Sequence, residues 1–69
     1  MTVSSDTPVE WLHRIRGEYD ESPGLRLTLR DAMRLWGLGA MECESLLGVL
    51  VEVRFLKRDK AGAYMREQD

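Results

Sequence analysis

The sequence predicts an α+β fold, with a three-helix core and a short three-stranded antiparallel sheet. Apolar residues recur at helical spacing in three segments, which begin near positions 8, 28 and 40. The third segment is followed by two short β-prone stretches around a glycine-containing loop, the pattern of a β-hairpin. The 69 residues leave room for one domain. We place it at residues 7–66, between a flexible N-terminus at 1–6 and a tail at 67–69.

The first helix is predicted to run from Pro8 to about Tyr19. Thr7 and Glu10 have the spacing of a capping box, and proline fits the first helical position. The segment Asp20–Gly24 ends the helix, because its proline cannot continue helical backbone. The residues predicted to face the core are Trp11, Leu12, Ile15 and Tyr19.

The second helix is predicted to follow a short strand at Leu25–Leu27. Thr28 can cap this helix, and Asp31 is favourable near its positive N-terminal end. Gly37 is predicted to end it in the left-handed conformation, which glycine adopts without strain. Its core-facing residues are Leu29, Ala32, Met33 and Trp36.

The third helix is predicted to begin after Gly39, and the hairpin follows it. The hairpin strands are placed at Phe55–Lys57 and Ala63–Met65, on either side of the loop Arg58–Gly62. The residues that this helix should bury are Cys43, Leu46, Leu47, Leu50 and Val51. Phe55 is also predicted to be a core residue.

These motifs resemble the winged helix–turn–helix domains of bacterial transcription regulators, and the resemblance covers Leu27 to Tyr64. The matching residues are Leu27-Thr28, Gly37-Leu38, Cys43, Leu46-Leu47 with Leu50, Phe55-Leu56, Gly62 and Tyr64. The chain departs from the family at Met33, where alanine is usual, and at Arg54, where glycine is usual. Arg54 must therefore take a left-handed conformation, at a cost of about 1 kcal/mol or more, or the helix must end differently.

The resemblance implies that the third helix enters the major groove of DNA. The matching face comprises Ala40, Met41, Glu42, Glu44 and Ser45, with Gly48 next to it. Base readout relies chiefly on Arg, Lys, Asn and Gln, and none of these occurs between Ala40 and Val53. The carboxylates can accept from cytosine or merely favour the N-terminal end of the helix, and they also repel phosphates.

Cations on the hairpin and on the second helix are better candidates for contact with DNA. Residues 25–66 hold eight basic residues and five acids. Arg30 and Arg34 are four residues apart and so share one helical face. The predicted contact residues are Lys57, Arg58, Lys60, Arg66, Arg30 and Arg34. The alternative is an ordinary solvated surface in which these cations pair with Asp31, Asp59 and Glu52.

Several classes of function are excluded by composition. One cysteine and one histidine cannot supply a disulfide or a four-ligand zinc site, and Cys43 is expected to be a buried, inert thiol. No catalytic constellation or cofactor motif is recognisable, so we expect no enzyme and no cofactor. The sequence contains no apolar run near 18 residues and no signal-peptide pattern, so we expect no membrane association and a cytoplasmic location.

We therefore expect a small DNA-binding, transcription-regulatory module that contacts the backbone of double-stranded DNA through its hairpin. The alternative is a protein-interaction module in which Met41, Glu44 and Gly48 on the third helix dock a partner protein. A homodimer, with Trp11 at its seam, is a further alternative.

Overall fold

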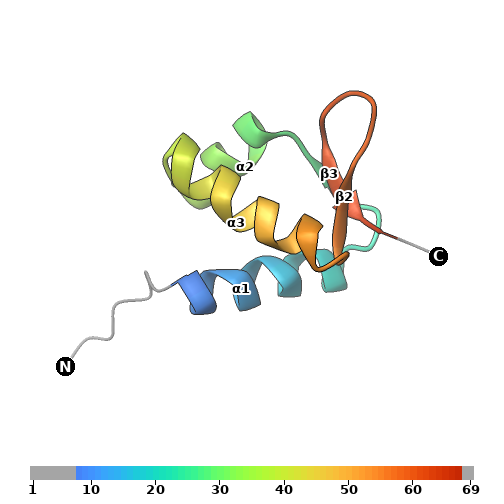
Figure 1. Ribbon diagram of the computed structural model, residues 1–69, viewed down its shortest axis with the longest axis horizontal. Helices are drawn as coiled ribbons and strands as arrows, with labels where there is room; N and C mark the ends of the chain where they lie inside the picture. The colour runs from blue at the N-terminus through green and yellow to red at the C-terminus, as the bar shows by residue number, and fades with distance from the viewer. Residues whose placement is uncertain (1–7, 68–69) are drawn as a thin grey trace.

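The computed structural model describes residues 8–67 as three helices with a small sheet at one end (Figure 1). The helices are α1 (Pro8–Glu21), α2 (Leu29–Trp36) and α3 (Ala40–Glu52). The strands are β1 (Arg26–Leu27), β2 (Leu56–Arg58) and β3 (Tyr64–Arg66), which form one antiparallel sheet. This arrangement confirms the predicted α+β fold class. The predicted cap at Thr7, the segment 1–6 and the last two residues of the tail lie outside the described residues.

Helix α1 extends beyond its predicted end at Tyr19 and stops at Glu21. Acidic side chains do not prevent helical backbone, whereas Pro23 also restricts the residue before it. The helix therefore continues to the last position that Pro23 allows. Ile15 and Tyr19 are fully buried on its inner face, as predicted.

Tyr19 joins α1 to the sheet. Its hydroxyl donates a buried hydrogen bond of 2.9 Å to the carbonyl oxygen of Tyr64. Burial is the main cause that raises the pKa of the Tyr19 phenol, and nearby Cys43 and Tyr64 add to it. The phenol therefore remains a protonated donor at neutral pH. The edge of its ring also meets the Phe55 ring, with 6.5 Å between centroids.

Helix α2 and the turn after it form as predicted. The Thr28 hydroxyl accepts from the backbone N–H of Asp31 at 3.1 Å, and the Asp31 carboxylate accepts from the backbone N–H of Thr28 at 3.3 Å. This is a capping box. Gly37 ends the helix with φ of 67°, and its N–H and that of Leu38 both donate to the Met33 carbonyl. The turn can therefore pass directly into α3.

Arg54, two residues after the end of α3, takes the left-handed conformation, one of the two alternatives that the sequence left open, with φ of 68°. The N–H of Phe55 donates to the Leu50 carbonyl and that of Arg54 donates to the Val51 carbonyl, both within 3.0 Å. These two hydrogen bonds define a Schellman motif, which usually has glycine at this position. The strained residue thus satisfies carbonyl groups that the end of the helix would otherwise leave unpaired.

The sheet has the strand order β1-β3-β2, and its strands are displaced from the predicted ones. Strands β2 and β3 each begin one residue later than predicted, and β1 lacks Leu25. The N–H of Phe55 is engaged with α3, so the strand can begin only after it. At the hairpin loop, the N–H of Asp59 donates to the carbonyl of Ala63, directly beyond the last strand pair of Arg58 and Tyr64, and so closes the loop. Glu67, assigned to the tail, still donates its N–H to the Phe55 carbonyl.

The core lies between the three helices and the inner face of the sheet. Its buried residues are Ile15, Tyr19, Leu27, Ala32, Cys43, Leu46, Leu47, Leu50, Leu56 and Tyr64. Seven residues predicted to be core are only half-buried at its edge, namely Trp11, Leu12, Leu29, Met33, Trp36, Val51 and Phe55. A domain of this size has too little chain to cover every side of a side chain at the core's edge.

Leu47→Ala should lower the free energy of unfolding by about 2–5 kcal/mol, because it removes buried contacts and leaves a cavity. Leu47 has no exposed surface, whereas Met41 on the same helix is 82% exposed. Met41→Ala is the matched control and should change stability by less than about 0.5 kcal/mol. Urea denaturation followed by circular dichroism measures both variants. Equal losses would contradict the register of α3.

Arg54→Gly should raise the free energy of unfolding by about 1 kcal/mol, because glycine adopts positive φ without a β-carbon clash. Arg54→Ala removes the same guanidinium and keeps the β-carbon, so it should bring no gain. Thermal and urea unfolding of the two variants measure the difference. Equal stability of the Arg54→Gly and Arg54→Ala variants would show that backbone strain at this position is negligible.

Candidate nucleic-acid interface

Asp59 organises the hairpin of β2 and β3 (residues 56–66), which we call the wing. One carboxylate oxygen of Asp59 accepts from the backbone N–H groups of Ala61 and Ala63, both at 2.9 Å. The other oxygen forms an ion pair with Arg26 on β1. Gly62 completes the turn with φ of 87°, and its N–H donates to the Asp59 carbonyl. A single carboxylate therefore shapes the loop and fastens it to the neighbouring strand.

The wing carries three cations at its surface. Lys57 and Lys60 are exposed, and within residues 8–67 neither makes an ion pair or hydrogen bond. Arg58 is exposed too, but its guanidinium carbon lies 5.3 Å from the centroid of the Tyr64 ring. This contact places the Arg58 guanidinium over a residue of β3.

Arg66 has a different environment from the other predicted contact residues. Its guanidinium donates to the Asp20 carboxylate at 2.8 Å and lies 4.7 Å from the centroid of the Phe55 ring. The residue is half-buried. Its charge is therefore offset inside the fold, where it links the end of α1 to the wing.

Arg30 and Arg34 are exposed on α2 and, among the described residues, make no ion pair. The start of α2 is tied to the wing in two ways. Strand β1, directly before it, pairs with β3, and Arg26 on β1 pairs with Asp59. Figure 1 shows α2 and the wing loop on the side of the molecule away from α1. The structure thus places α2 and the wing loop, which carry Arg30, Arg34 and Lys60, on one side of the molecule.

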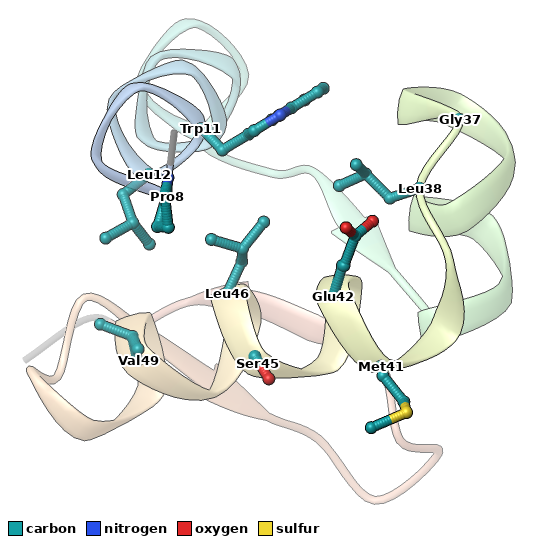
Figure 2. Close-up of a pocket in the computed structure, with 10 residues that line it drawn as sticks. All are labelled: Pro8, Trp11, Leu12, Gly37, Leu38, Met41, Glu42, Ser45, Leu46 and Val49. Carbon is teal, nitrogen blue, oxygen red and sulfur yellow. The ribbon is translucent and has the colours of Figure 1, made fainter. Parts of the chain in front are cut away.

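All five residues assigned to the recognition face of α3 are exposed, but they do not share one face. Glu42 and Glu44 are two residues apart, so they project about 200° from each other around the helix. In Figure 2, Glu42 points toward α1, whereas Met41 and Ser45 point to the other side of α3. The remaining members of the predicted face are Ala40 and Glu44. The outward surface of α3 therefore offers small and apolar groups and carboxylates, with no cation.

A hollow of about 580 Å³ opens between α1, the α2–α3 turn and α3 (Figure 2). Its walls include Trp11 and Leu12 from α1, Leu38 from the turn, and Glu42 and Leu46 from α3. This hollow was not predicted from the sequence. The only signal for it was the presence of Met41 and Val49 on the third helix, because both are apolar residues outside the stripe that faces the core.

A second feature is a set of exposed apolar residues, of which the sequence predicted only Met41, on the partly apolar face of the third helix. On α3, Met41, Val49 and Val53 are 82%, 43% and 64% exposed. Val9 on α1 is 61% exposed and lies across a smaller hollow from Val49 and Val53. Apolar surface of this kind on a recognition helix contributes nothing to phosphate binding, and it is suited to contact with protein or with an apolar ligand.

Cys43 is fully buried, and burial raises the pKa of its thiol, which favours the unreactive protonated form. Within residues 8–67, no three His, Cys, Asp or Glu side chains gather closely enough to hold a metal ion. In the same part of the chain, no helix has the length and apolar character needed to cross a bilayer.

Comparisons with protein-family models, with curated proteins and with solved structures found no match for this chain.

Asp59→Asn should flatten the pH dependence of stability in acid. The hydrogen bond from Arg26 is the largest cause that lowers the pKa of Asp59, and backbone N–H groups contribute too. A carboxyl whose pKa is lower in the folded state stabilises the fold above its unfolded pKa, about 3.9, and loses that contribution as the pH falls through the folded value. Urea unfolding of wild type and Asp59→Asn at several values between about pH 5 and pH 2 measures the effect. Parallel stability curves would show that Asp59 is not linked to folding.

Proposed function

We propose that the chain is a small DNA-binding, transcription-regulatory module of the bacterial cytoplasm that contacts the phosphate backbone through the wing and α2. The observation that carries this proposal is a set of exposed cations on α2 and the wing, without ion-pair partners among the described residues. They are Lys57 and Lys60 on the wing and Arg30 and Arg34 on α2. Arg58 joins them from its position on the Tyr64 ring.

Backbone contact requires no more than this set of cations. Each Lys or Arg that neutralises a phosphate releases a condensed counterion, and this supplies essentially all of non-specific affinity. The wing loop is held by Asp59 and Arg26, so Lys60 is presented on an ordered turn, while Lys57 is presented on β2. We therefore expect an affinity that depends steeply on salt and little on DNA sequence.

Helix α3 has a secondary role in this proposal. Direct readout of bases needs donors such as Arg, Lys, Asn or Gln, and α3 carries none. Glu44 and Glu52 are exposed on it and would repel phosphates of a duplex seated against the wing. Support for DNA as the ligand comes from the cation set and from the resemblance of Leu27 to Tyr64 to winged helix–turn–helix domains, and a fold alone does not fix function.

A protein partner is the second candidate, and the exposed apolar surface of α3 favours it. Met41 and Val53 expose more than half of their surface, next to the carboxylates of Glu44 and Glu52. A surface with that chemistry fits a partner segment that combines apolar and basic residues. In this case the wing cations would be an ordinary solvated surface.

Removing a wing cation should reduce the salt dependence of DNA binding. Lys57→Ala and Lys60→Ala should each lower the slope of log K against log salt by about one unit, because one phosphate contact is lost. Glu44→Gln should strengthen binding by removing repulsion. Fluorescence-anisotropy titrations of a mixed-sequence duplex at several salt concentrations measure all three variants.

Arg14→Ala is the matched control, because Arg14 is a cation of α1 that stacks on Trp11, outside the proposed interface. It should leave the salt slope unchanged. If Arg14→Ala lowered the salt slope as much as the wing variants do, the effect of those variants would be explained by net charge and not by contact through the wing. Absence of duplex binding by wild type and all variants at low salt would overturn the DNA proposal and favour a protein partner.

A further inference from the structure

The hollow between α1, the α2–α3 turn and α3 has the size and walls of a small-molecule site. Its volume of about 580 Å³ lies within the roughly 300–1,000 Å³ range of ligand pockets in proteins. Most of its walls are apolar side chains contributed by three separate parts of the fold, namely Trp11, Leu12, Leu38 and Leu46. A ligand that filled it would therefore gain free energy chiefly by burying apolar groups.

Among residues 8–67, Glu42 is the one ionisable residue that lines this hollow. Figure 2 shows its carboxylate directed into the space between Leu38 and Leu46, below the Trp11 ring. Within residues 8–67, Glu42 makes no ion pair and no hydrogen bond. An unpaired carboxylate beside apolar walls attracts a cation more strongly than one surrounded by water.

Trp11 adds a second attraction for positive charge. The face of an indole ring binds cations, and Trp is the most effective aromatic side chain in this respect. The guanidinium carbon of Arg14 already lies 5.0 Å from the centroid of the Trp11 ring. Arg14 does not line the hollow, so it leaves the space between Trp11 and Glu42 unfilled.

We propose that this hollow binds a lipophilic organic cation, such as an ammonium or phosphonium ion that carries aromatic or branched aliphatic groups. The apolar groups contact Leu12, Leu38 and Leu46, and the positive charge lies near the Glu42 carboxylate. None of the cations in the proposed DNA interface lines this site, so the proposal does not rest on DNA binding.

Two probe ions of nearly equal shape and opposite charge test the proposal, tetraphenylphosphonium and tetraphenylborate. Isothermal titration calorimetry of the full chain should show saturable binding of one phosphonium ion and much weaker binding of the borate. Glu42→Gln should weaken phosphonium binding by about fivefold, the usual effect of removing one partly exposed ion pair. In NMR spectra, the phosphonium should shift the indole N–H of Trp11 more than that of Trp36.

Glu44→Gln is the matched control, because it removes the same charge from the same helix at an exposed position outside the hollow. It should leave phosphonium affinity unchanged. Circular dichroism confirms that both variants are folded at the temperature of the titrations, since either change weakens favourable charge near the N-terminus of α3.

Four results would overturn the proposal. They are absence of phosphonium binding, equal or tighter binding of the borate, equal losses of affinity in Glu42→Gln and Glu44→Gln, and a dimer of the chain that excludes the phosphonium. Sedimentation velocity of the same samples detects the dimer. A dimer that excludes the phosphonium would show that a second copy of the chain occupies the hollow.

Discussion

The relation between the helices and the sheet depends on the side chain of Tyr19. It is fully buried, and its hydroxyl donates to the backbone of β3 while its ring meets Phe55. A phenol in the core needs a partner, because an unsatisfied buried hydroxyl costs about 1–3 kcal/mol. The carbonyl of Tyr64 meets that need only when β3 lies against α1. The Tyr19 hydroxyl therefore couples two events. Helix α1 can bury this side chain at low cost only when the wing strand β3 is in its place.

Basic residues serve two purposes in this chain, and the structure separates them. Some guanidinium groups cover aromatic rings at the edge of the core, as Arg16 and Arg66 do over Phe55. These side chains exclude water from rings that the small core leaves half-covered. Arg66 also pairs with Asp20 and so acts within the fold. By contrast, Arg30 and Arg34 on α2 and Lys57 and Lys60 on the wing are exposed and make no ion pair among the described residues, although the whole chain has a net charge of −2.

Local signals in the sequence predicted most of the backbone. Capping by Thr28, the left-handed turn at Gly37 and the unusual end of α3 at Arg54 each depend on residues within a few positions of one another. The predicted start of β2 was wrong because the N–H of Phe55 donates to the Leu50 carbonyl at the end of α3. That N–H is therefore not free for the sheet. Helical periodicity identified the centre of the core but not its edge, where burial depends on how neighbouring helices cross.

The candidate sites were less predictable for the same reason. The exposed lysines of the wing could be read from the hairpin pattern alone. By contrast, the pairing of Arg66 with Asp20 joins segments far apart in the chain. Glu42 could be placed on α3, but its direction relative to Trp11 depends on the packing of α1 against that helix. The angle between α1 and α3 is not encoded in any local sequence pattern. The hollow could therefore be identified only from the three-dimensional structure.

Cys43 gives the chain an internal reporter of its own unfolding. It is the single cysteine of the sequence, and its thiol lies in the centre of the core with no exposed surface. A thiol reagent in solution can reach this sulfur only when α3 separates from the helices and the sheet that cover it. The rate of alkylation in native buffer is then set by how often the core opens, and it can follow stability without denaturant or an added label.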